Sequence, residues 1–214
     1  MKIDAVDFAS LLCSRLCHDV LSPVAALSNG LELLSQETDA ERRQDIEALL
    51  EDSTRATVNK LKFFRLAFGV AGALGDVIES HEARDAMQGV FAANRRIQLG
   101  WLVADTHLAK PAVKMMLNLA LIAGDALVRG GQLDVGAELV PGRTEIVIRA
   151  EGERLVLDDP IRNTLLGMPP HPGTLAPRLG PALLARALVT SHHGRLQVSE
   201  PDGGQLLLGA VFPS

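Results

Sequence analysis

The stretch FASLLCSRLCHDVLSPVAALSNGLELL (residues 8–34) decides the fold of this chain. Its apolar residues recur every three or four positions, which is the spacing of one face of an amphipathic helix. They form a seam close to a heptad repeat, made of Leu12, Leu16, Val20, Val24, Leu27, Leu31 and Leu34. The sequence therefore predicts a first long helix that spans about residues 8–34.

A second long helix is predicted after the polar break SQETDAER (35–42), where a threonine or an aspartate can cap the first turn. It should span about residues 40–68, with a seam of its own made of Ile46, Leu50, Thr57, Leu61, Phe64 and Phe68. The glycine-rich segment GVAGALGD (69–76) then ends it. We therefore expect a helical hairpin domain of residues 1–75 and a second domain of residues 76–214.

Two long helices joined by a short loop form an antiparallel hairpin with an apolar stripe that must be covered. A four-helix bundle covers it, and this half of the chain supplies two helices of the required length. We therefore predict a twofold homodimer in which a second copy supplies the other two helices. The alternative is that the hairpin packs on the C-terminal half of its own chain.

The second half of the chain alternates between helical and extended patterns. Helices are predicted at about 80–94, 110–131 and 180–192, and strands at 97–103, 132–140, 143–151, 194–200 and 205–212. Pro141-Gly142 and PDGG (201–204) are hairpin turn signals. The predicted fold class is α + α/β: an N-terminal antiparallel hairpin, then a two-layer α/β sandwich with helices on one face of a mixed sheet.

Composition narrows the classes of function. The chain has 214 residues, 47% of them hydrophobic, and a formal net charge of -5, which argues against a nucleic-acid partner. It has no apolar run long enough to span a membrane and no signal-peptide pattern at its start, so we expect a cytoplasmic protein without a membrane partner. Cys13 and Cys17 are poorly placed for a disulfide, and the run Cys13-x-x-x-Cys17-His18 has one residue too many between its cysteines for haem attachment.

His18 is predicted to face away from the core of the bundle. At about 100 degrees per residue, the seam residues fall on the opposite side of the helix from His18. Apart from Arg15, the residues that share its face are small or mildly apolar, which suits the docking of another protein's helix. They are Leu11, Ser14, Arg15, Leu21, Ser22, Ala25 and Asn29.

Three neighbours favour a reactive histidine over an inert surface histidine. Asp19 can orient the imidazole or accept its proton, which leaves a neutral ring nitrogen as a nucleophile. Pro23 removes the backbone hydrogen bond to residue 19 and should kink or loosen the helix one turn beyond His18. Arg15, one turn before it, can offset the charge of a phosphoryl group.

The segment HDVLSP (18–23) resembles the H-box of sensor histidine kinases, H-[DE]-x-x-[ST]-P. In those proteins the H-box lies on the first helix of a dimerisation and phosphotransfer hairpin. The resemblance implies that His18 is phosphorylated on a ring nitrogen and passes the phosphoryl group to an aspartate of a receiver domain.

The second domain resembles the ATP-binding domain of the same kinases, but its nucleotide motifs are broken. Ile122 stands where the family has a magnesium-binding asparagine, and Mg²⁺ requires oxygen ligands. AEGER (150–154) replaces the adenine motif D-x-G-x-G, and PRLGPA (177–182) replaces the glycine-rich phosphate loop. We therefore expect no ATP and no resident metal, and we interpret His192-His193 as a helix C-cap and not as a metal site.

The whole chain resembles the ChpT family of alphaproteobacterial histidine phosphotransferases. This resemblance implies a cytoplasmic phosphorelay that serves cell-cycle regulation. His18 would accept a phosphoryl group from the receiver domain of a hybrid histidine kinase and pass it to response regulators of the CtrA and CpdR type, with Mg²⁺ supplied by the receiver. The alternatives are an ATP-dependent histidine kinase and a non-catalytic dimeric scaffold.

Overall fold

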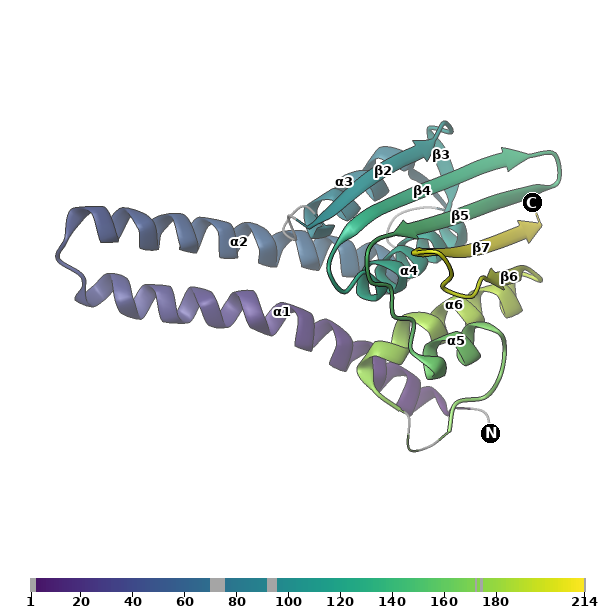
Figure 1. The fold of residues 1–214 in the computed structure, drawn as a ribbon, viewed down its shortest axis with the longest axis horizontal. Helices are drawn as coiled ribbons and strands as arrows, with labels where there is room; N and C mark the ends of the chain where they lie inside the picture. The colour runs from purple at the N-terminus through teal and green to yellow at the C-terminus, as the bar shows by residue number, and fades with distance from the viewer. Residues whose placement is uncertain (1–2, 70–75, 92–95, 172, 174, 214) are drawn as a thin grey trace.

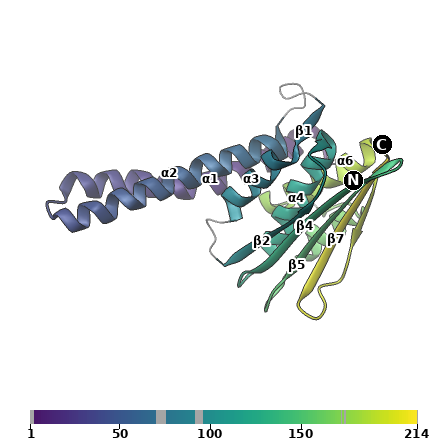
Figure 2. The ribbon, with the colours of Figure 1, turned by 90° about the horizontal axis from the view of Figure 1, so that it is seen from above.

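A long helical hairpin and an α/β domain make up the molecule, which is a computed structural model described over residues 3–69, 76–91, 96–171, 173 and 175–213. Helices α1 (Ala5–Gln36) and α2 (Ala40–Phe68) form the hairpin, and its tip projects away from the α/β domain (Figure 1 and Figure 2). The predicted pair of helices is confirmed, and α1 is longer than predicted at both ends. Within the described residues, no helix combines the length and the apolar character needed to cross a bilayer.

The turn between the two helices is closed by side chains that bind its free backbone groups. Glu37 Oε1 accepts hydrogen bonds from the N–H groups of Asp39 and Thr38, both at 2.9 Å, and these bonds hold the pKa of Glu37 below its ordinary value. Asp39 Oδ1 caps α2 by accepting from the Arg42 N–H at 3.0 Å. Arg43 Nη1 donates back to the carbonyl groups of Leu34 and Glu37. The polar break in the sequence thus makes a tight and well-capped turn.

A mixed five-stranded sheet forms the outer layer of the α/β domain, with the order β2-β4-β5-β7-β6. The pair β2–β4 is parallel, and the other neighbouring pairs are antiparallel. These strands are β2 (Ile97–Val103), β4 (Gly131–Val140), β5 (Arg143–Glu151), β6 (Arg195–Val198) and β7 (Gln205–Pro213). A separate two-stranded antiparallel sheet pairs β1 (Val77–Glu79) with β3 (His107–Ala109).

Helices cover the face of the sheet that looks toward the hairpin (Figure 2). They are α3 (Ser80–Phe91), α4 (Lys110–Ala126), α5 (Asp159–Leu165) and α6 (Gly180–Ser191), with the short 3₁₀ turn η3 (Pro177–Leu179) before α6. Helix α4 lies in the middle of the core, because it packs on α2, α6 and β5 and nearly all of its side chains are buried. The predicted two-layer arrangement is confirmed.

The base of the hairpin packs on the α/β domain of its own chain. The start of α1 contacts η3 and α6, and the end of α2 contacts α3 and α4. The approach is close, because a Cβ atom at Gly180 would lie 3.1 Å from a side-chain carbon of Leu12. Phe63 and Phe64 at the end of α2 are buried in the core of the domain. The alternative of packing within one chain therefore holds for the base of the hairpin.

The outer part of the hairpin is different, because large apolar side chains there remain exposed in the single chain. They are Leu21, Val24, Leu31 and Leu33 on α1, and Leu49, Val58 and Leu61 on α2. Val24, Leu31 and Leu61 belong to the predicted seams, so the two helices alone leave part of the apolar stripe uncovered.

Several short elements were not predicted. The strands β1 and β3, the helix α5 and the turn η3 are each too short to give a clear periodic pattern. Helix α4 ends at Ala126, earlier than predicted, and Leu127 then forms a β-bridge with Leu155. The predicted domain boundary at 69–76 falls almost wholly outside the described residues.

Phe63 gives a test of the joint between the hairpin and the α/β domain. It is fully buried and makes edge contacts with Phe64 and Phe91. We expect Phe63→Ala to lower the free energy of unfolding by about 3–5 kcal/mol, because it removes the ring and leaves a cavity. Chemical unfolding measures this change, and Leu102→Ala on the open face of the sheet is the control. A loss as small as that of the control would contradict the packing described here.

Candidate functional site

The first feature of the site is the carbonyl group of Asp19, which Pro23 deprives of its helical hydrogen bond. A proline has no N–H, so residue 23 cannot donate to the carbonyl of residue 19. Lys60 of α2 takes its place, and its Nζ lies 2.6 Å from the Asp19 carbonyl oxygen. The predicted break in the ladder is present, but α1 continues through it as one helix to Gln36. Proline and lysine together tie the two helices of the hairpin beside His18.

His18 is the most accessible part of the site. Its side chain is 84% exposed on α1, and its Nδ1 lies 3.2 Å from Asp19 Oδ1. When Nδ1 carries the proton it donates to that carboxylate, and Nε2 then holds the free lone pair. A neutral imidazole in this form is a nucleophile that another molecule can reach.

Arg15 lies behind the histidine and joins the hairpin to the α/β domain. Its guanidinium is buried, and its Nη1 and Nη2 donate to the two carboxylate oxygens of Asp125 at 2.6 and 3.2 Å. Its Nε donates to Asp19 Oδ2 at 2.9 Å. Burial alone would lower the pKa of Arg15, but the hydrogen bonds and charges of Asp125 and Asp19 outweigh it and raise that pKa.

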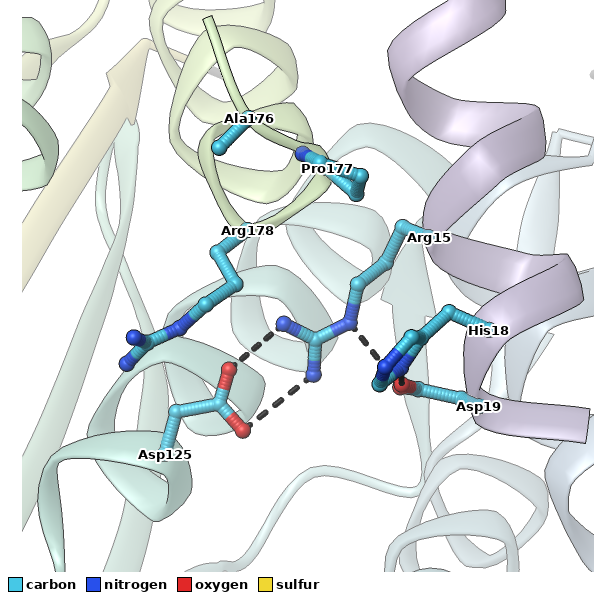
Figure 3. Close-up of a pocket in the computed structure, with 7 residues that line it drawn as sticks. All are labelled: Arg15, His18, Asp19, Asp125, Ala176, Pro177 and Arg178. Atoms are coloured by element: carbon cyan, nitrogen blue, oxygen red, sulfur yellow. Dashed lines mark hydrogen bonds and ion pairs between the residues drawn. The ribbon is translucent and has the colours of Figure 1, made fainter. Parts of the chain in front are cut away.

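These residues line one open pocket at the junction of the two parts of the molecule (Figure 3). The pocket has a volume of about 450 Å³. Its far wall consists of Ala176, which precedes η3, and of Pro177 and Arg178 in η3. Arg178 forms an ion pair with Asp158 at 3.1 Å. His18 therefore stands at the rim of a pocket that both parts of the chain build.

The structure divides the face of α1 that was predicted to dock a partner. Five of its residues are exposed: Ser14, Leu21, Ser22, Ala25 and Asn29. Leu11 and Arg15 are instead buried within the chain, which corrects the expectation that they lie on the docking surface. The reason is that η3 and α6 cover the first turns of α1, and helical angles alone carry no information about that contact.

The residues that stand where nucleotide motifs were expected are packed against the rest of the chain. Ile122 and Ala150 are buried in the core, and Pro177–Leu179 forms the turn that rests on α1. Asn118 is also buried, where its Nδ2 donates to the carbonyl groups of Ala67 and Lys114. Its Oδ1 has no hydrogen-bond partner among the described residues.

The C-terminal end of α6 agrees with the predicted cap. The His192 N–H donates to the Leu188 carbonyl at 3.0 Å, and His193 adopts a positive φ of 53°. In the part of the chain that the structure describes, no three His, Cys, Asp or Glu side chains gather as a metal site would require.

Sequence reasoning missed three residues of the site: Lys60, Asp125 and Arg178. A signal was present for the first two. A proline inside a helix frees a carbonyl that needs a donor, and an arginine that becomes buried needs an anion. The identity of the partner, however, depends on how α2 and α4 approach α1 in space.

The fold and the site together define a class of protein. An exposed histidine with an acidic neighbour lies on the first helix of a hairpin. The α/β domain beside it has a packed turn where a nucleotide-binding protein needs a free phosphate loop. This combination defines a histidine phosphotransfer protein.

Comparison with known proteins identifies the family. Residues 80–204 match the family model of the histidine phosphotransferase C-terminal domain. The chain is 40% identical over 155 residues to the protein phosphotransferase ChpT of Brucella abortus (strain 2308), with 72% of each chain covered. This chain therefore belongs to the histidine phosphotransferase family.

One solved structure supports the arrangement of the whole chain. A bacterial phosphotransferase is similar with a TM-score of 0.85 and 29% identity, and the match covers 98% of both chains. It thus includes the hairpin and the α/β domain in one superposition. The histidine kinase AdeS of Acinetobacter baumannii is similar with a TM-score of 0.47 and 12% identity, over 92% of this chain and 97% of that chain.

The pairing of Pro23 with Lys60 can be tested by a double-mutant cycle. We expect Lys60→Met to lower the free energy of unfolding by about 1–2 kcal/mol, because it removes a charged donor from the Asp19 carbonyl. In a Pro23→Ala background, the backbone N–H restored at position 23 can donate to the same carbonyl, so the loss should shrink by about 1 kcal/mol. Chemical unfolding of the four proteins gives the coupling energy. Lys62→Met, at an exposed position of α2, is the control, and strict additivity would refute the pairing.

Proposed function

We propose that this histidine phosphotransferase accepts a phosphoryl group on His18 from the receiver aspartate of a hybrid histidine kinase. It then passes the group to receiver aspartates of response regulators in a bacterial phosphorelay. The observation that carries the proposal is the exposed imidazole of His18 with its Nδ1 held by Asp19. The family, and the name of the relative from Brucella abortus, support phosphotransfer.

The transfer can be written so that its atoms balance. Nε2 of the neutral imidazole attacks the phosphorus of the donor's aspartyl phosphate, so a P–N bond forms while the P–O bond to the aspartate breaks. The donor carboxylate leaves with the electron pair. The ring gains positive charge, which the Nδ1–H to Asp19 hydrogen bond stabilises. In the second transfer an acceptor carboxylate attacks the phosphorus, and Nε2 recovers its lone pair.

The phosphoryl group is proposed to come from a receiver domain and not from ATP. Ile122 offers no oxygen to a cation, and the turn Pro177–Leu179 is folded against α1 instead of being open to phosphates. Phosphoryl transfer still requires neutralisation of the oxygens around phosphorus. We assign that role to Mg²⁺ that the receiver domain brings with it.

The exposed residues around His18 are the proposed docking surface for the receiver. Ser14, Leu21, Ser22, Ala25 and Asn29 form a face with small side chains and one large apolar group, which can accommodate a helix of the partner. Response regulators of the CtrA and CpdR type are the acceptors that we propose, in the cytoplasm and in the service of cell-cycle control.

A homodimer is proposed to cover the stripe that the single chain leaves exposed. Val24 and Leu31 lie about 120 and 140 degrees around α1 from His18, so their burial leaves the histidine free. Val58 and Leu61 of α2 are three residues apart, so they share one face of that helix, and both are exposed. A second copy related by a twofold axis can pair its stripe with this one as a four-helix bundle.

The central prediction is that His18→Ala abolishes transfer. A phosphorylated receiver domain with a ³²P label is mixed with the protein, and the label on the chain is followed by gel electrophoresis. We expect labelling of the wild type and none of His18→Ala. The matched control is His81→Ala, because His81 is also an exposed histidine whose Nδ1 is within 3.0 Å of a carboxylate, that of Glu79.

The same labelling assay distinguishes phosphotransfer from the two alternatives, an ATP-dependent histidine kinase and a non-catalytic scaffold. Label from γ-³²P-ATP on His18 would indicate an ATP-dependent kinase. Unchanged labelling of His18→Ala, or a lack of labelling of the wild type by any receiver, would leave a scaffold as the better description. Each of these three results would contradict the proposed phosphotransfer.

The dimer is tested at Leu31, which is 60% exposed in the single chain. We expect Leu31→Glu to convert the dimer to a monomer, because it places a charge in the proposed interface. Size-exclusion chromatography with light scattering gives the mass. Leu102→Glu, at a position that is 72% exposed on the open sheet face, should remain dimeric. A monomeric wild type at micromolar concentration would contradict the proposed assembly.

A further inference from the structure

A chain of charged contacts runs from the α/β domain to the reactive histidine. It begins at Asp125 of α4, passes through Arg15 and Asp19 of α1, and ends at Nδ1 of His18 (Figure 3). The residues lie far apart in the sequence, since 110 positions separate Arg15 from Asp125. The phosphoryl transfer written above uses His18 and Asp19 and assigns no part to the other two.

The N–H donors of Arg15 are shared between Asp125 and Asp19, and this sharing decides which oxygen of Asp19 can bind His18. Asp125 takes both terminal nitrogens, one on each of its oxygens, so Nε is the donor left for Asp19. Nε reaches Asp19 Oδ2, and the second oxygen, Oδ1, is free to accept from His18. An arginine commonly binds a carboxylate with two parallel N–H bonds. Asp125 therefore keeps Arg15 from binding both oxygens of Asp19.

The other groups around the imidazole do not supply this constraint. Arg178 lines the same pocket, but its Nη1 is paired with Asp158. Lys60 binds the backbone carbonyl of Asp19 and so fixes the main chain, while the side chain depends on Arg15. The Arg15 side chain is 7% exposed, and a buried guanidinium must keep its carboxylate partners.

We propose that Asp125 and Arg15 are positioning residues that keep one oxygen of Asp19 available to His18 Nδ1. This inference rests on the proposed function and deepens it. The α/β domain then contributes to the chemistry of phosphotransfer through Asp125, although Asp125 does not touch the reacting atoms. With Nδ1 held as the donor, Nε2 is the nitrogen that carries the lone pair for attack.

The test is Asp125→Asn, which keeps the shape of the side chain but leaves one oxygen to accept from Arg15. One terminal nitrogen of Arg15 is then free to bind Asp19 Oδ1 in competition with His18. The first measurement is the two-bond ¹H–¹⁵N spectrum of the full-length chain at about pH 8.5, which is about two units above the reference pKa of an imidazole in peptides. His18 is assigned among the six histidines by its absence in His18→Ala. The wild type should show the Nδ1–H tautomer, and Asp125→Asn should shift it toward Nε2–H.

The second measurement is the rate of labelling by a phosphorylated receiver. We expect Asp125→Asn to slow it by about 10- to 100-fold, the range in which a misplaced reactive group lowers a rate. The matched control is Asp134→Asn, since Asp134 forms a comparable ion pair with Arg149 at 2.6 Å on the outer face of the sheet. Circular dichroism and thermal unfolding establish that both variants fold. If Asp125→Asn does not, Asp125→Glu, which keeps the charge and shifts the carboxylate by one methylene, tests the same geometry.

The outcomes separate this inference from the proposed function. Loss of the Nδ1–H tautomer together with slower labelling, in Asp125→Asn and not in Asp134→Asn, supports the positioning role. An unchanged tautomer and an unchanged rate overturn it, while the wild type still transfers. If no receiver labels the wild type, the proposed function fails, and the tautomer measurement still decides whether Asp125 orients the ring.

Discussion

The burial of one guanidinium between two carboxylates is the interaction on which the arrangement of this molecule depends. Removing a charged side chain from water costs several kcal/mol, so Arg15 can be buried because Asp19 and Asp125 receive its donors. One carboxylate belongs to α1 and the other to α4, and the hairpin must therefore meet the α/β domain at this place. The close contact of Leu12 with Gly180 requires the same approach. The rim of the pocket beside His18 follows from these two contacts.

The hydrophobic core of the α/β domain is built around helix α4. Helix α4 is buried on nearly every side, so Ile122 adds apolar area where an asparagine would have to find polar partners. Asn118, one turn earlier, illustrates the cost, because its Oδ1 is buried without a partner in the described part of the chain. A core of this kind stabilises the sheet and helices without any bound nucleotide. The domain can then serve to hold α1 in place and to supply Asp125.

The elements with long periodic patterns could be predicted from the sequence, and those defined by contacts could not. The seams of α1 and α2, the turn at Gly142 and the strands β4 and β5 follow from spacing and turn chemistry. The exposure of His18 also follows from helical angles. The burial of Leu11 and Arg15 does not, because an isolated helical wheel contains no second domain. The pairing of Asp125 with Arg15 could not be predicted either, because the fold brings together two residues that are 110 positions apart.

The turn η3 stands at the position of the expected phosphate loop and also forms part of the pocket beside the histidine. A loop that wraps phosphates must expose its backbone N–H groups and must be able to move. The segment Pro177–Leu179 instead forms a 3₁₀ turn that packs on α1. A partner that approaches His18 then meets a fixed wall, Ala176 to Arg178, as well as the exposed face of α1. Because this wall packs on α1, under the proposed function it would limit the shapes of partner that can reach His18. The wall of the pocket and the carboxylates behind the imidazole thus depend on the same contact between the two parts of the chain.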